Sequence, residues 1–183
     1  IGKLSCVGCF REYAYDIHQA ADDYELARFH CHQVIKQGEQ FSERGDRRWL
    51  ATLKLGILDV YEGEIELARQ KFETAWELAQ LETVNDIPSA KFGVAMELHF
   101  LDMIEGKPSD PRFDELVNNL PPQGECIEYD LDRDYIHAMK LALLGEWDQA
   151  EELLVKWHRF CKQQKSISRW LESGIRLVAC KRL

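Results

Sequence analysis

A fixed spacing of small residues recurs along this chain of 183 residues and limits the folds that are open to it. In the clearest copy the landmarks are Gly56, Gly63, Ala68, Phe72 and Ala75, at steps of 7, 5, 4 and 3 residues. The same steps recur in one good and one degraded copy, at Ala138, Gly145, Ala150, Leu154 and Trp157 and at Tyr15, Asp22, Ala27, Cys31 and Val34. Self-similarity of this kind indicates stacked structural units rather than one irregular core.

The landmarks fit a pair of antiparallel helices. Glycine at the middle landmark, as at Gly63 and Gly145, ends a first helix because it adopts the left-handed conformation without steric cost. Alanine five residues later, as at Ala68, allows the second helix to approach the first closely. The large residue four positions further on, Phe72 in the clearest copy, shares a helix face with that alanine and fills the gap between the helices. The spacing therefore predicts helix hairpins that must stack to bury their apolar faces.

The pattern G-x6-G-x4-A-x3-F-x2-A resembles the signature of tetratricopeptide (TPR) repeats, over roughly residues 4 to 165. The resemblance implies an all-α fold, a right-handed superhelix of antiparallel helix pairs with about four repeats and a terminal helix. The third repeat matches only in its first helix, because Pro111 occupies the slot of the close-packing alanine. The turn positions Asp22, Gly63, Gly106 and Gly145 lie 41, 43 and 39 residues apart, whereas the standard period is about 34 residues. The longer period is similar to the extended TPR-like repeats in sensor domains of some bacterial transcription regulators.

We expect a single TPR-like repeat domain over residues 1–183, excised from a longer protein, because the chain starts at Ile1 and stops within a helical pattern. Asp46 and Asp110 are expected as N-terminal caps, and Pro111 as the first residue of a short helix. The predicted helices cover residues 3–20, 24–43, 47–62, 65–82, 88–105, a short segment from 111, 130–144, 147–163, and a last helix from 166.

Composition excludes several classes of protein. No apolar run approaches membrane length and no signal-peptide pattern opens the sequence. We expect a cytoplasmic protein because the cysteines are predicted to be free thiols in a reducing compartment. The net charge of −9 argues against nucleic-acid binding. The charge is uneven: residues 156–183 carry 8 basic residues and one acidic residue, a net of +7, which leaves −16 on the rest. This basic stretch is either a solvated helix end or a docking patch for an acidic neighbour.

The resemblance also implies a function, because in a TPR superhelix the first helix of each pair lines the concave groove. The positions that it assigns to the groove are apolar: Leu53, Ile57, Tyr61, Met96, Phe100, Met103, Tyr135 and Met139. We therefore predict a scaffold that binds a protein or peptide, such as an amphipathic helix. Tighter supercoiling would instead bury these side chains as core. Asp59 and Asp102 occupy equivalent slots and are candidates for polar contacts in the groove, although both could lie at its rim.

No catalytic constellation, nucleotide loop or cofactor motif is recognisable, so an enzyme is not expected. The six cysteines are predicted to be free thiols. Cys6, Cys9, His30 and His32 are residue types that bind zinc, and they lie within one predicted pair of helices. Residues 6 and 9 should pair with the far end of the next helix, and His30 and His32 point to different sides, so no metal site is predicted. Two alternatives to the scaffold remain: an oligomerisation element, and a ligand-sensing segment of a larger regulatory protein.

Overall fold

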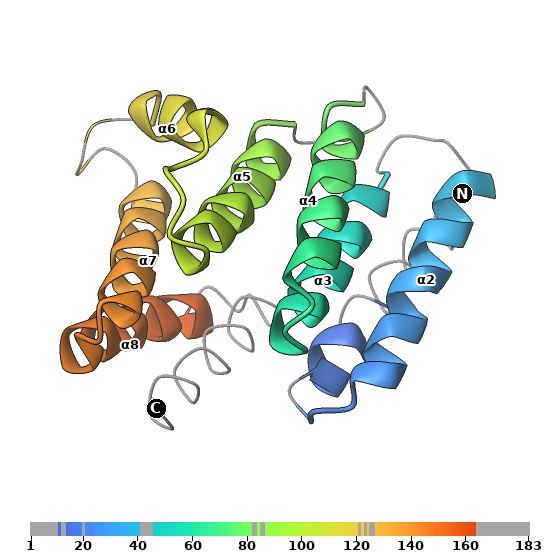
Figure 1. The fold of residues 1–183 in the computed structure, drawn as a ribbon, viewed down its shortest axis with the longest axis horizontal. Helices are drawn as coiled ribbons and strands as arrows, with labels where there is room; N and C mark the ends of the chain where they lie inside the picture. The colour runs from blue at the N-terminus through green and yellow to red at the C-terminus, as the bar shows by residue number, and fades with distance from the viewer. Residues whose placement is uncertain are drawn as a thin grey trace. The chain divides into compact units, whose positions relative to one another are not determined.

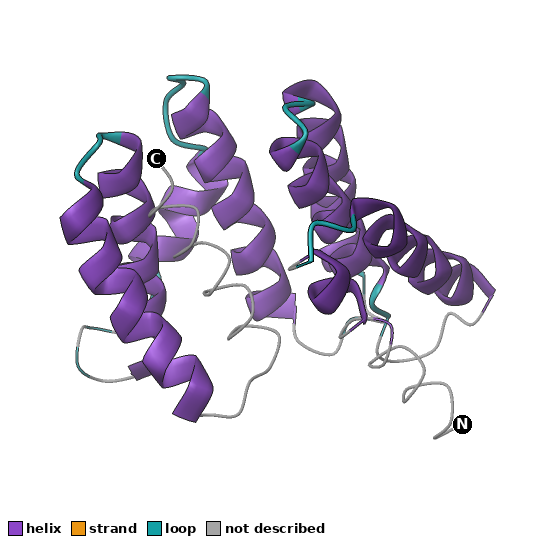
Figure 2. Ribbon diagram, turned by 90° about the horizontal axis from the view of Figure 1, so that it is seen from below, coloured by secondary structure: helices purple, strands orange, loops and turns teal. Residues whose placement is uncertain are grey.

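The computed structural model describes residues 11, 14–19, 21–40, 46–81, 84, 87–120, 122, 124 and 127–163. Within these residues the chain forms helices and turns and no strand, which confirms the all-α prediction (Figures 1 and 2). The predicted last helix from residue 166 and four of the six cysteines, Cys6, Cys9, Cys126 and Cys180, lie outside the described residues. No helix of the described part is both long and apolar enough to cross a membrane.

The chain divides into two compact units, residues 1–101 and 102–183. The described part of the first unit begins with helical residues 11 and 14–19 and continues with α2 (Tyr24–Gln40), α3 (Arg48–Tyr61) and α4 (Ile65–Ala79). Helix α5 (Ile87–Ile104) spans the boundary between the units. The second unit contains α6 (Pro111–Asn118), α7 (Ile127–Leu143) and α8 (Trp147–Gln163). The predicted helix ranges agree with these bounds to within a few residues.

The four predicted turn positions share one backbone geometry. Asp22, Gly63, Gly106 and Gly145 all have positive φ, between 57° and 82°. At each turn an amide donates a hydrogen bond of 2.8–2.9 Å to a carbonyl five residues earlier: Asp23 to His18, Glu64 to Asp59, Lys107 to Asp102 and Glu146 to Leu141. This bond is the 6→1 bond of a Schellman C-cap, which satisfies a carbonyl that the helix end leaves unpaired. The four turns are therefore alike at the level of individual hydrogen bonds.

The second helix starts in the same way after three of these turns. Ala27, Ala68 and Ala150 each donate their amide to the carbonyl of the residue four positions earlier, directly after the turn. All three alanines are fully buried. In the third copy the corresponding helix, α6, begins at Pro111, where the carboxylate of Asp110 accepts from the Arg112 amide at 2.8 Å. The predicted cap at Asp110 is thus confirmed.

The predicted cap of α3 at Asp46 is wrong, because the N-cap position is Arg47, which makes no side-chain cap hydrogen bond. The Asp46 carboxylate accepts from the Arg48 amide at 2.9 Å and pairs with the Arg48 guanidinium at 2.6 Å. Asp110 and Arg112 form the same amide bond and a matching ion pair of 2.6 Å. Asp110 therefore caps α6, whereas Asp46 lies one residue before the cap position of α3; each carboxylate holds both the amide and the guanidinium of an arginine in the first turn.

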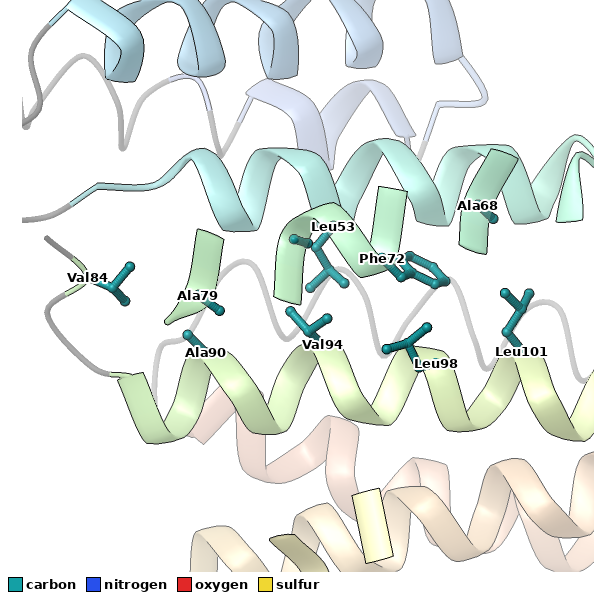
Figure 3. Packing of buried hydrophobic residues seen from close by; sticks show 10 residues of the cluster. Leu53, Ala68, Phe72, Ala79, Val84, Ala90, Val94, Leu98 and Leu101 are labelled. Atoms are coloured by element: carbon teal, nitrogen blue, oxygen red, sulfur yellow. The ribbon is translucent and has the colours of Figure 1, made fainter. Parts of the chain in front are cut away.

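The first unit has two clusters of buried side chains, which meet at α3. One cluster joins α3 and α4 to α5 through Leu53, Phe72, Val94 and Leu98 and their neighbours (Figure 3). The other joins residues 14–19 and α2 to α3 through Tyr15, Ala27, Cys31, Val34, Ala51, Leu55 and Leu58. Helix α3 thus packs against the preceding helices on one side and the following helices on the other, as stacked hairpins require.

The second unit contains a shorter version of this packing. The three-residue turn 144–146 joins α7 and α8, so the two helices run antiparallel. Their landmarks Ala138, Ala150 and Leu154 are fully buried. The rings of Tyr135 and Trp157 stack with centroids 4.5 Å apart. Trp157 stands at the landmark that Ala75 occupies in the clearest copy of the spacing. The ring of Tyr135 on α7 is the surface against which Trp157 stacks.

Candidate functional site

Helix α3 carries three of the predicted groove residues, and they lie in different environments. Leu53 is only 6% exposed and belongs to the core cluster with α4 and α5. Ile57 is partly exposed and packs at the edge of the same cluster. Tyr61 is partly exposed, and its ring stacks on that of Tyr24 at a centroid distance of 6.3 Å. Of these three residues, Ile57 and Tyr61 therefore keep surface that a partner could contact.

The predicted groove residues of α5 and α7 divide in the same way. Phe100 and Tyr135 are 4% and 1% exposed. Met96 is partly exposed on the part of α5 in the first unit, whereas Met103 and Met139 are partly exposed in the second unit. Leu53, Phe100 and Tyr135 are thus placed as core side chains, as the tighter-supercoil alternative expects. Ile57, Tyr61 and the three methionines retain surface for a partner.

Asp59 lies inside an ion-pair network rather than at an open surface. Its side chain is 3% exposed, one oxygen lies 2.7 Å from the Arg28 guanidinium of α2, and the other pairs with Lys71 of α4. Arg28 also pairs with Glu62 at 2.5 Å. Both oxygens of Asp59 are therefore engaged by the helices on either side of α3. The expectation that Asp59 orients a partner in the groove does not match this placement, because the carboxylate serves to join α2, α3 and α4.

Asp102 matches Asp59 in its backbone. It too is buried, and its carbonyl accepts the 2.8 Å bond from Lys107 that closes the turn at Gly106. The carbonyl of Asp59 closes the turn at Gly63 in the same way. The two aspartates therefore occupy equivalent positions because the carbonyl of each closes the turn at the end of its helix.

The described cysteines are packing residues. Cys31 and Cys161 are buried free thiols. Burial raises the pKa of the Cys31 thiol to about 12, so the nucleophilic thiolate is scarce at neutral pH. In the part of the chain that the structure describes, no three side chains of His, Cys, Asp or Glu are grouped to hold a metal ion. Cys6 and Cys9 lie outside that part.

An acidic groove runs along α7 and α8 in the second unit, and the sequence analysis did not single it out. It is open to solvent and has a volume of about 1020 Å³. Its lining combines five carboxylates with two cations and three apolar side chains, and includes Asp130, Asp134, Asp148, Glu151, Glu152, Lys156, Arg159, Leu153, Val155 and Phe160. Asp130 pairs with Arg133 at 3.0 Å, and Asp134 pairs with Lys156. Asp148 and Glu152 are exposed one helical turn apart, a spacing that suits two contacts to one basic partner.

Polar residues also surround a contact between Tyr15 and Lys54 in the first unit. The Tyr15 hydroxyl donates to the Lys54 carbonyl at 3.1 Å, and the Lys54 ammonium lies 4.4 Å from the centre of the Tyr15 ring. The same ammonium pairs with Asp16 at 2.5 Å. Lys54 is separated from Tyr15 and Asp16 by almost forty residues, so no local sequence pattern could have identified this group.

No family model, curated protein or solved structure matches the chain.

Proposed function

We propose that this chain is a TPR-like helical-repeat scaffold that binds a protein or peptide, without catalysis or a cofactor. The observation that carries the proposal is the repeated Schellman turn followed by a close-packed alanine, which places successive hairpins against one another in the first unit. Hairpins that stack in this way build extended binding surfaces in repeat proteins. A right-handed superhelix is the arrangement that the resemblance to TPR repeats favours. The buried free thiols suit a reducing, cytoplasmic setting.

The partner surface in the first unit would comprise Ile57 and Tyr61 of α3 and Met96 of α5. All three are partly exposed and lie on the helices that the TPR resemblance assigns to the groove. Tyrosine and methionine suit such a role, because tyrosine offers a large rigid surface and methionine adapts to different apolar shapes. The partner class that fits is an apolar or amphipathic segment.

Selection of a displayed library of helical peptides against the chain tests this proposal. The affinity of enriched peptides would be measured by fluorescence anisotropy for the wild type and for a Tyr61→Ala/Met96→Ala variant. We expect at least a tenfold loss of affinity, about 1.4 kcal/mol, with an unchanged circular dichroism spectrum. Leu67→Ala, at an exposed apolar position on α4, serves as the control and should bind normally. Equal binding by all three proteins, or no enriched peptide, would contradict the proposal.

A second candidate function is self-association through the acidic groove of α7 and α8. Residues 164–183 carry five basic residues and one acidic residue, a net of +4, which complements the carboxylates that line the groove. The partner would be this segment from a second copy. Light scattering should then show a dimer at low salt that dissociates at high salt, and Asp148→Asn/Glu152→Gln should weaken it. A monomer at every concentration and salt would exclude this function.

A further inference from the structure

In the first unit, a helix that opens a hairpin packs on the second helix of the hairpin before it through an apolar set at spacing i, i+4 and i+7. Helix α3 carries this set as Ala51, Leu55 and Leu58, all buried in one cluster with residues of α2. Helix α5 carries it 43 residues later as Val94, Leu98 and Leu101, all buried in one cluster with residues of α4 (Figure 3). Residues at this spacing share one helix face. We call this face the stacking face of each first helix.

The first hairpin has a stacking face that is exposed to solvent. The positions equivalent to those of α3 lie 41 residues earlier, at 10, 14 and 17, and residue 10 lies outside the described part of the chain. Ala14 is partly exposed and Ile17 is 57% exposed, whereas its counterparts Leu58 and Leu101 are buried. In the fourth copy the same position is also exposed, and it carries Lys140. The exposed position is therefore polar in the fourth copy and apolar in the first.

The second helices that cover the stacking faces of α3 and α5 share a sequence pattern. Each has a small residue and apolar residues four and seven positions later: Ala27, Cys31 and Val34 in α2, and Ala68, Phe72 and Ala75 in α4. An arginine follows the small residue in both helices, as Arg28 and Arg69. The interior of the first unit therefore shows the chemistry of the helix that an exposed stacking face accepts.

One polar position distinguishes the first hairpin from α3. The carboxylate next to the stacking face of α3 is that of Asp59, which receives Arg28 of α2 at 2.7 Å. The equivalent residue of the first hairpin, 41 positions earlier, is His18. Its ring stacks on that of His30 at 5.4 Å, and its Nδ1 lies 3.7 Å from Asp23, beyond hydrogen-bond distance. Because an imidazole N–H and an arginine are both donors, a helix that docks here should carry an acidic residue where α2 has arginine.

We propose that the stacking face of the first hairpin, formed by Ala14, Ile17 and His18, docks an amphipathic helix of a partner protein. The partner helix carries a small residue, an acidic residue directly after it, and apolar residues four and seven positions after the small one. Docking continues across the interface the helix packing that joins the hairpins of the first unit. The face is separate from the partner surface proposed above, because it uses none of the groove residues.

Helix α8 supplies a probe with this pattern. The residues that match it are Ala150, Glu151, Leu154 and Trp157. In the folded chain Ala150, Leu154 and Trp157 are buried, so a second copy does not present them, whereas a free peptide of residues 146–163 does. Side-chain crosslinks keep this peptide helical, because isolated helices of this length are marginally stable in water. The same peptide with Glu151→Arg is the matched control.

Fluorescence anisotropy of the labelled peptide measures its affinity for the chain. We expect saturable binding to the wild type and a loss of about tenfold or more in Ile17→Lys, which places a charge where an apolar side chain would be buried. The circular dichroism spectrum should not change, because Ile17 is exposed. The Glu151→Arg peptide should bind about fivefold more weakly. Leu144→Lys, at an exposed position of the second unit, and the groove variant Tyr61→Ala/Met96→Ala should bind as the wild type does. No saturable binding, or equal binding by Ile17→Lys or of the Glu151→Arg peptide, would overturn the proposal.

Hydrogen exchange and sedimentation locate the contact and test the other occupants of the face. The peptide should slow amide exchange in residues 14–19 of the wild type and leave α7 unchanged. Slower exchange confined to α7 would mean that the peptide replaces α8 in its own hairpin, and would overturn the proposal. Self-association of the chain alone that Ile17→Lys abolishes would assign the face to a second copy, and would overturn it as well.

Discussion

Gly56 of α3 lies directly against the ring of Phe72 of α4. A Cβ added at Gly56 would lie 2.6 Å from Phe72 Cδ1, closer still to Cε1, and 3.3 Å from the Ala68 carbonyl oxygen. Phe72 is fully buried, so its ring cannot move out into solvent without leaving the core. The two helices thus approach at the minimum separation that their backbones and this ring permit.

Gly56→Ala should destabilise the first unit. The gain in helix propensity is about 1 kcal/mol, and overpacking of a filled core costs about 1–3 kcal/mol or more; we expect a net loss of roughly 1–2 kcal/mol because both the ring and the backbone oxygen resist displacement. Urea denaturation measures the change. Gly93→Ala is the matched control: it lies inside α5 with no atom within 4 Å of the added Cβ, and should stabilise the protein by up to about 1 kcal/mol.

Asp59→Asn should loosen the contacts of α3 with both neighbours. The substitution keeps the shape of the side chain but removes the charge that pairs with Arg28 and Lys71. Both cations retain some contact with water, so we expect a loss of about 1–3 kcal/mol, less than for a fully buried pair. Glu105→Gln, which breaks the more exposed pair with Lys107, should change the free energy of unfolding by less than about 0.5 kcal/mol. Similar losses in the two variants would show that the network around Asp59 adds nothing to stability.

Cys31 should make the stability fall in alkaline solution. Because burial raises the folded-state pKa of the thiol to about 12 from the ordinary value of 9.0, the unfolded chain releases the proton first as pH rises. The contribution is complete below pH 9 and is lost progressively between pH 9 and 12. The difference in free energy of unfolding between the wild type and Cys31→Ala, measured by urea denaturation, should shrink as the pH is raised from 8 to 10. In the native state Cys31 should resist a thiol reagent at pH 8; rapid reaction without unfolding would contradict its burial.

His30 should make the stability fall in acidic solution. Its folded-state pKa is lowered from 6.5, so the unfolded chain takes up the proton first as pH falls. Its contribution is therefore present above about pH 6.5 and declines below it. Thermal denaturation should show a smaller decline in stability between pH 7 and 5 for His30→Gln than for the wild type. His32→Gln, an exposed position two residues away on α2, should follow the wild type; if it instead matched His30→Gln, the decline would not belong to His30.

The local features of this fold could be predicted from the sequence, whereas the surroundings of individual side chains could not. The turns at Gly63, Gly106 and Gly145 follow from glycine alone, and the approach of α3 and α4 follows from the spacing of Gly56, Ala68 and Phe72. The burial of Leu53, Phe100 and Tyr135 depends on how far each helix is rotated toward its neighbours, which a period of 3.6 residues does not fix. The partners of Asp59 come from two other helices, and Lys54 contacts Tyr15 and Asp16 almost forty residues earlier, so no pattern along the sequence indicates them.

Asp22 is the one described residue other than glycine with positive φ, and the three later turns of the same geometry have glycine at this position. A side chain in the left-handed region costs about 1 kcal/mol, and the first hairpin carries that strain while the others do not. Amide protons next to this turn should therefore exchange with deuterated water before those next to Gly63 and Gly145. The chain would then open first at this amino-terminal turn. The single substitution Asp22→Gly should make the exchange rates at the turns more similar to one another.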